Sequence, residues 1–274
     1  MSTYLVHYSY NAADNSFTAI NRFDEIWLLG NEEYDVTAYY PHVGEEGTVP
    51  PVQTVEITSE NQDTPEERAA FDFLYASTKA TKAEPNVHLN FNHAMSRVNL
   101  KFVPGTDPEG NPVTLTDIEC YLVGIKRNGT FDTETGVAAV AEDAAVSDLR
   151  QMLNADNDYT FTAYLLPQTI GAEGLLIEAT MRSTDGRRIY YSLEIPVSDW
   201  PEMKAGYSYN YTLTANDYMT ASPTVLEISG TDINPWTEVN KEETPDAKAL
   251  GTEAYVNGAE WGEMENEEIV PEVK

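Results

Sequence analysis

The chain has 274 residues, with 46 acidic and 16 basic side chains, so its formal net charge is −30 at pH 7. Such a field repels phosphate backbones and anionic membrane surfaces, which excludes nucleic acid as an expected partner. The length is ample for a buried core, and the 17 tyrosines suit a folded, β-rich protein.

Cys120 is the only cysteine, which excludes an intrachain disulfide and a cysteine-based metal cluster. It falls on the same strand face as Ile118 and Leu122, so we predict a small buried apolar residue and not a reactive thiol. No apolar run approaches the length of a membrane span. The first residues, MSTYLVHYSY, show no signal peptide and are interpreted as the start of a trimmed or mature chain.

The first part of the chain combines strand patterns with loops. Residues 22–30 and 34–42, RFDEIWLLG and YDVTAYYPH, predict two strands around a Gly-Asn turn, and Pro41 ends the second strand. Residues 48–60 predict a loop followed by a short strand.

The strongest helix signal follows, in TPEERAAFDFLYAS. Thr64 can cap the helix, Pro65 suits its first position, and Glu67 stands three residues after the cap, as a capping box requires. The sequence therefore predicts a short helix over about residues 65–75.

From residue 87 onward the pattern is strand after strand. Asn128-Gly129 and Asp185-Gly186 are each typical of the turn in a β-hairpin. VSDLRQML, residues 146–153, is interpreted as one or two helical turns with Ser147 as the cap.

A tyrosine ladder marks the last clear strand of this series, in GYSYNYTLT. Tyr207, Tyr209 and Tyr211 share one face of the strand, and Leu213 continues that face. Small polar residues alternate with them and make a natural wet face. The ladder is either a carbohydrate platform or part of a core, and we favour the core because Tyr buries its ring readily.

These patterns predict an all-β protein with two consecutive antiparallel β-sandwich domains and few short helices. We assign residues 1–86 to an N-terminal domain and residues 87–240 to a C-terminal domain. The boundary falls in ATKAEPNV, where Ala, Lys and Pro break the strand pattern. Residues 241–274 form an acidic C-terminal extension whose composition suits a flexible or conditionally ordered segment.

The sequence offers no catalytic, cofactor-binding or metal-binding constellation, and we expect the protein not to be an enzyme and to hold no cofactor. His88 and His93 would face opposite sides of one strand, so structural roles are favoured over a metal pair. NADNDYT, residues 154–160, has the alternating oxygen ligands that open a calcium loop. It lacks the glycine and the distal glutamate of such a loop, and a solvated turn is expected.

Six motifs then follow one another in order: YDVTAYYPH, DFLYAS, FNHAMSRVNLKF, YLLPQT, WPEMKAGYSYNYTLT and ISGTDINPWTEV. Over about residues 20–239 the chain resembles the fimbrillin-like (Mfa-like) family of Bacteroidetes surface proteins. The resemblance implies two β-sandwich domains of transthyretin-like topology. It also implies export as a lipoprotein to the outer membrane or into extracellular type V pili, and assembly there by donor-strand exchange. It implies no catalytic or cofactor residues.

The first functional hypothesis is therefore a structural or adhesive subunit, or an accessory component, of cell-surface fimbriae. Its partners would be other pilus subunits, together with host or bacterial surface receptors or glycans. A stalk, an anchor and a tip position are all open. The alternative is a surface glycan-binding protein of a polysaccharide-uptake system, which would use exposed Tyr and Trp residues.

Two further expectations concern the end of the chain. Trp236 follows Pro235 in DINPWTEV, and we predict that its ring is buried against the C-terminal domain. In the acidic extension, Tyr255, Ala259 and Trp261 fall at odd positions and are the candidate donor-strand residues. The segment would lie along a sheet edge and complete its ladder. A solvated tail that packs loosely on its own domain is the alternative.

Overall fold

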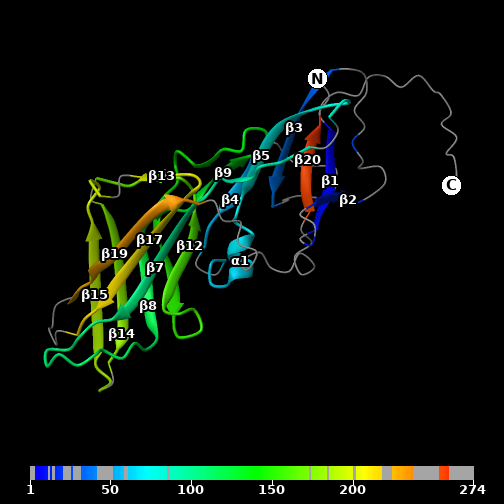
Figure 1. Cartoon of the computed structure of the whole chain (residues 1–274). Helices are drawn as coiled ribbons and strands as arrows, with labels where there is room; N and C mark the ends of the chain where they lie inside the picture. The colour runs from blue at the N-terminus through cyan, green and yellow to red at the C-terminus, as the bar shows by residue number, and fades with distance from the viewer. Residues whose placement is uncertain are drawn as a thin grey trace.

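The structure is a computed structural model of the chain. It describes residues 4–11, 13, 16–20, 26, 32–41, 52–58, 61–84, 87–172, 174–183, 185–199, 202–217, 224–236 and 253–258. Within these residues the regular secondary structure is almost entirely β-strand. Two β-bodies lie end to end in an elongated molecule (Figure 1). Among the same residues, no helix is long and apolar enough to cross a membrane.

The larger body is a sandwich of a five-stranded and a four-stranded sheet. In spatial order, the five-stranded sheet consists of β11 (Val146–Leu153), β8 (Ile118–Lys126), β14 (Leu175–Arg182), β15 (Arg188–Ile195) and β18 (Thr224–Val225). The four-stranded sheet consists of β12 (Thr160–Leu165), β7 (Ser96–Pro104), β17 (Tyr207–Ala215) and β19 (Glu227–Pro235). A small additional sheet pairs β13 (Gln168–Thr169) with β16 (Glu202–Met203).

The alternating apolar residues of these strands form the main core. Tyr209, Tyr211 and Leu213 of β17 are all buried, which confirms that the tyrosine ladder packs inward. The hydroxyl of Tyr209 donates to the carbonyl of Glu202 and accepts from the amide of Lys204, each at 2.9 Å. The ring is thus buried while its polar end is satisfied at the margin of the core.

The second body contains a six-stranded sheet. In spatial order it consists of β2 (Ser16–Ala19), β1 (Tyr4–Asn11), β20 (Glu253–Gly258), β3 (Glu33–Tyr40), β5 (Leu74–Thr81) and β6 (Asn92–His93). The strand predicted over residues 34–42 is present as β3. Apart from Ile26, the strand predicted over residues 22–30 lies outside the described residues.

A three-stranded sheet of β10 (Ala138–Val140), β9 (Asn128–Asp132) and β4 (Val52–Glu56) lies where the two bodies meet. Phe131 of β9 packs against Phe73 and Tyr39 of the second body, with ring centroids 4.7 Å and 6.3 Å apart. One continuous core therefore runs through the junction. The division of the sequence near residue 86 stays a prediction, since β4 pairs with a strand from beyond that point.

Helix α1 (Pro65–Ala69) begins as its sequence predicts. Thr64 is the N-cap, and its side chain and that of Glu67 form both hydrogen bonds of a capping box. The helix is shorter than the predicted range of 65–75, because Phe73 and Leu74 are buried and the chain has become strand β5 by Leu74. Burial of these side chains in a sheet outweighs the weak helix propensity of the segment.

Two local predictions were wrong. Residues 146–153 form strand β11, in which Leu149, Gln151 and Leu153 are buried with a period of two. Asn128 and Gly129 belong to strand β9 and not to a hairpin turn. A Cβ atom built on Gly129 would lie 2.1 Å from the Ala139 carbonyl oxygen, so this glycine permits close approach of β10.

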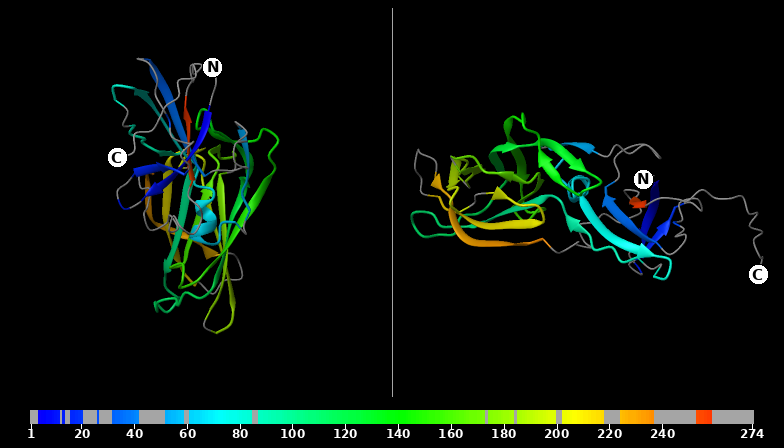
Figure 2. Two further views of the ribbon diagram at one scale, coloured as in Figure 1. Left: turned by 90° about the vertical axis from the view of Figure 1, so that its right-hand side faces the viewer. Right: turned by 90° about the horizontal axis from the view of Figure 1, so that it is seen from above.

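The hairpin predicted at Asp185-Gly186 is confirmed. It joins β14 to β15 in antiparallel register, and Gly186 has a φ of +84°. Two strand pairs among the described residues are parallel: β7 with β17 in the centre of the four-stranded sheet, and β15 with the short strand β18 in the five-stranded sheet. Figure 2 shows the two bodies from two further sides.

Candidate functional site

The most unusual placement in the fold is that of the C-terminal strand. β20 lies between β1 and β3 and is antiparallel to both, although β1 and β3 are close in sequence and β20 comes from the end of the chain (Figure 1). The segment was expected along a sheet edge. It is instead an inner strand, whose backbone pairs with β1 on one side and with β3 on the other. Each of these strands has a further neighbour on its far side, β2 beside β1 and β5 beside β3.

The register identifies which residues of β20 stand beside which neighbours. Tyr255, one of the three predicted donor-strand residues, is opposite His7 of β1 and Tyr39 of β3. Ala259 and Trp261 lie outside the described residues. Val256 is opposite Val6 and Ala38. Val256 is not among the three predicted donor-strand residues, and the face of β20 that serves assembly stays a prediction.

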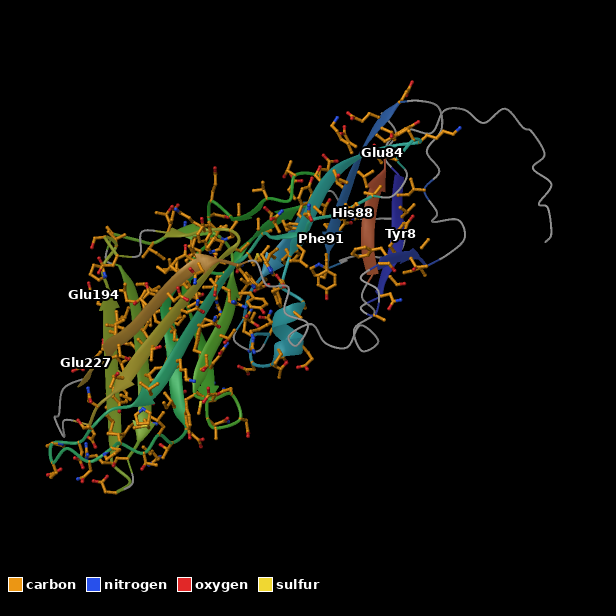
Figure 3. The ribbon with its side chains drawn as sticks, viewed as in Figure 1. Tyr8, Glu84, His88, Phe91, Glu194 and Glu227 are labelled. Atoms are coloured by element: carbon orange, nitrogen blue, oxygen red, sulfur yellow. The ribbon has the colours of Figure 1, made fainter. Side chains whose placement is uncertain are left out.

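The neighbours of Val256 belong to a small apolar cluster on one face of the six-stranded sheet. Its buried centre is Val36, Ala38 and Ala80, and the half-buried residues packed on it are Val6, Tyr8, Ile26, Leu89 and Phe91. Figure 3 labels Tyr8 and Phe91 of this cluster. The hydroxyl of Tyr8 accepts a hydrogen bond from the amide of Ile26 at 3.3 Å, which ties the covering segment to β1. A strand inserted here thus completes the backbone ladder beside this cluster.

Trp236, directly after β19, is the last described residue before β20. It is 5% exposed, as the sequence predicted. Its ring stacks on that of His93, with centroids 3.5 Å apart and planes inclined by 7°. The Tyr164 ring lies 4.9 Å away, and the guanidinium carbon of Arg97 lies 4.7 Å from the tryptophan centroid. We call His93, Arg97 and Tyr164 the tryptophan socket.

A hydrogen bond between His93 and Asp72 supports this socket from the side of the six-stranded sheet. Nδ1 of His93 lies 2.5 Å from Oδ1 of Asp72, and both side chains are largely buried. The imidazole is therefore held by a carboxylate on one side and by an indole ring on its face. His88 is exposed, and it does not join His93 in a metal pair.

The remaining candidates from the sequence have structural surroundings. Cys120 is fully buried, and burial raises the pKa of its thiol, which opposes reactivity at neutral pH. Asn154 and Asn157 use their side-chain oxygens to accept from backbone amides of their own loop. Within the described part of the chain, no group of three or more His, Cys, Asp and Glu residues is arranged to hold a metal ion.

The chain was compared with protein-family models and with curated proteins. A family model described as fimbrillin-like matches residues 1–236. No curated protein matched the chain.

Solved structures with a similar fold include two crystal structures of candidate cell adhesion proteins. The first, from Bacteroides ovatus, has a TM-score of 0.66 and 23% identity, with 86% of this chain and 88% of that chain covered. The second, from Bacteroides uniformis, has a TM-score of 0.64 and 19% identity, with 86% of this chain and 91% of that chain covered. At these identities the likeness establishes the fold.

Proposed function

We propose that this chain, which belongs to the fimbrillin-like family, is a structural or adhesive component of cell-surface fimbriae. In this proposal the subunits assemble by exchanging β20. Fimbrillin-like proteins are fimbrial and cell adhesion proteins, and such a role requires a position at the cell surface. The single observation that supports the exchange is the placement of β20 as an inner strand of the six-stranded sheet.

An inner strand from the chain terminus is well suited to exchange. When β20 leaves, β1 and β3 each lose a row of backbone hydrogen bonds. The same strand from a second copy restores every one of these contacts, because its sequence is identical. The two arrangements therefore differ little in enthalpy, and the local concentration of the strand decides between them.

The connection to β20 is long enough for either arrangement. Residues 237–252 join Trp236 to β20, and a fully extended segment of this length spans up to about 55 Å. This reach allows β20 to enter the sheet of its own subunit or that of an adjacent one. The isolated subunit is then self-complemented, and assembly consists of replacing an internal strand by the strand of a neighbour.

Paired cysteines test the exchange directly. Ser9 of β1 and Glu253 of β20 are register partners, and Cβ atoms of directly opposed strand residues lie within reach of a disulfide. The double variant Ser9→Cys/Glu253→Cys is expected to form a ladder of covalent oligomers after oxidation under assembly conditions. Buried Cys120 does not compete, and each single variant serves as the control.

The alternative outcome is equally clear on a non-reducing gel. A double variant that yields covalent monomers alone, while fibres or oligomers still form, would show that assembly leaves β20 in its own sheet. A second arm uses a chain ending at residue 240 as the acceptor and a peptide of residues 241–274 as the donor. Val256→Asp, Tyr255→Asp, Ala259→Asp and Trp261→Asp in the peptide then determine which positions contribute to binding.

The glycan-binding alternative has lost its main sequence candidates. Tyr209, Tyr211 and Trp236 are buried and offer no stacking face. Tyr190 on the outer face of β15 is 50% exposed and is the natural residue to substitute in a glycan-array experiment. Binding that disappears in Tyr190→Ala would favour this alternative.

A further inference from the structure

Strand β19 is held by its backbone ladder with β17 and by one buried side chain beyond each of its ends. The strand has nine residues, and all of its side chains are exposed or half-buried. Leu226, immediately before it, is 1% exposed, and Trp236, immediately after it, is 5% exposed. Between these two anchors the strand depends on its backbone ladder with β17. Whatever pulls on the chain beyond Trp236 therefore acts first on Trp236.

The tryptophan socket joins the two bodies of the molecule. His93 belongs to β6 of the six-stranded sheet, whereas Arg97 and Tyr164 belong to β7 and β12 of the four-stranded sheet. The Arg97 side chain is itself fixed, because its Nε donates to Oγ of Ser208 at 3.0 Å. Trp236 thus contacts one residue of the six-stranded sheet, His93, and two residues of the four-stranded sheet, Arg97 and Tyr164.

The backbone also secures the tryptophan. The Trp236 amide donates to the carbonyl of Gly206 at 2.6 Å, and the Gly206 amide donates to the carbonyl of Met95 at 2.9 Å. Gly206 has a φ of +71°, and a Cβ atom there would lie 3.3 Å from the His93 carbonyl oxygen. A glycine at this position lets three chain segments meet under the indole ring.

We propose that Trp236 and its socket form a mechanical anchor at the root of the C-terminal strand. Tension on that strand passes through Trp236 into both sheets. The proposal deepens the proposed function, because it supposes that the C-terminal strand connects subunits under tension.

The direction of β19 supports this role. The strand runs antiparallel to β17 and points toward the six-stranded sheet (Figures 1 and 2). A force that pulls residue 237 in that direction acts along the strand, so all the β17–β19 hydrogen bonds carry it together. Hydrogen bonds loaded together resist more than bonds opened one by one. The buried Trp236 side chain lies at the end of β19 to which the force is applied, so it must leave its socket before the strand can detach.

Optical-tweezers measurements on the full chain can test the anchor. One handle is attached to a cysteine at Glu109, an exposed residue of the loop after β7 at the far end of the larger body, and the other to the C-terminus, so that residue 237 is pulled along the direction of β19. Pulling is expected to release β20 first and then to stop at the tryptophan socket until a second rupture. Trp236→Ala is expected to shorten the lifetime of that second state under constant force by at least about tenfold.

Matched variants separate the anchor from general stability. His93→Ala removes one wall of the socket and should also shorten the second state, whereas Trp236→Phe should shorten it less. Tyr190→Ala, an exposed aromatic residue of the other sheet, should leave both ruptures unchanged. If Trp236→Ala does not fold, the lifetimes of the second state in His93→Ala and Trp236→Phe test the anchor instead.

A second rupture with the same lifetime in the parent, His93→Ala and Trp236→Phe would overturn the anchor. So would a parent chain whose six-stranded sheet opens before the socket does. Neither result affects strand exchange, because a single chain is pulled and no assembly is needed. Conversely, failure of the disulfide ladder would reject exchange while leaving the mechanical measurement intact.

Discussion

Three buried glutamines illustrate how single residues close this fold. Both β11 and β12 are edge strands, and β12 pairs with β7 on one side alone. On its free side, the Gln62 side-chain amide accepts from the amide of Tyr164 and donates to its carbonyl, and Gln151 does the same for Thr162. Gln168 forms the equivalent pair with Lys126. Gln62 and Gln151 thus take the place of a neighbouring strand along the free edge of β12 and protect it from pairing with other chains, whereas Gln168 satisfies the end of the inner strand β8.

The first prediction at this scale concerns Gln62. Replacing it by Leu keeps the volume but leaves the amide and carbonyl of Tyr164 buried without partners, which costs about 2–4 kcal/mol. Urea unfolding of Gln62→Leu should show a lower midpoint with an unchanged slope. Glu178→Leu, on the exposed outer face of β14, is the control and should stay close to the parent. Equal midpoints for the two variants would mean that water replaces the glutamine.

The second residue-scale prediction concerns the stability supplied by Trp236. Its ring is buried among His93, Arg97 and Tyr164, so Trp236→Ala should lower the free energy of unfolding by about 3–5 kcal/mol. Chemical denaturation measures this loss. A variant that unfolds like the parent would contradict the packing around the indole ring.

At the scale of elements, the two hairpin signals had opposite outcomes for a physical reason. Asp185-Gly186 closes a hairpin because the strands on both sides alternate and pair with each other over their whole length. Asn128-Gly129 follows β8 of the five-stranded sheet and begins β9, which pairs with β4 and β10. The strands on its two sides do not pair with each other, so no hairpin forms there. The turn propensity of a dipeptide decides the structure only when the flanking strands agree.

Gly186 gives a clean test at this scale. It has a φ of +84° and no heavy atom within 4 Å of a built Cβ, whereas Gly171 has the same open space without a positive φ. Gly186→Ala should therefore destabilise the protein by about 1–2 kcal/mol, since the left-handed conformation disfavours a Cβ. Gly171→Ala should be close to neutral. Thermal melts compare the two, and equal shifts would contradict the turn geometry.

At the scale of the whole molecule, the two bodies are tied together by several contacts that cross the predicted boundary. β4 pairs with β9, Gln62 closes the edge of β12, and Asp72 holds the ring of His93. The apolar core is continuous through the same region. These contacts argue against two independently folding halves.

Calorimetry tests this coupling. The chain should unfold in a single transition whose calorimetric and van't Hoff enthalpies agree, because the shared core links the two bodies. Two separate transitions, one of which survives unchanged in the fragment of residues 87–240, would show that the bodies fold independently. The release of β20 is a local event and should not add a transition, since a strand can open without the rest of the sheet.

The sequence by itself determined the class of the fold, the hairpin at Asp185-Gly186, the capping box of α1 and the inward packing of the tyrosine ladder. Each depends on a pattern of neighbouring residues, which side-chain alternation and turn chemistry encode directly. It also suggested that the acidic C-terminal segment contains a strand. The residues of that strand that matter for assembly stay a prediction, with Val256 added to the original three.

The tertiary structure alone decided which strands are neighbours. The insertion of β20 between β1 and β3, the parallel pairing of β7 and β17, and the strand conformation of residues 146–153 all depend on partners far away in the chain. The same holds for the packing of Trp236 in its socket, which brings residues 93–97, Tyr164 and Trp236 together from distant parts of the chain. A strand does not specify its partner locally, because backbone hydrogen bonds are the same for every sequence. The choice is made by the apolar faces that each pairing buries.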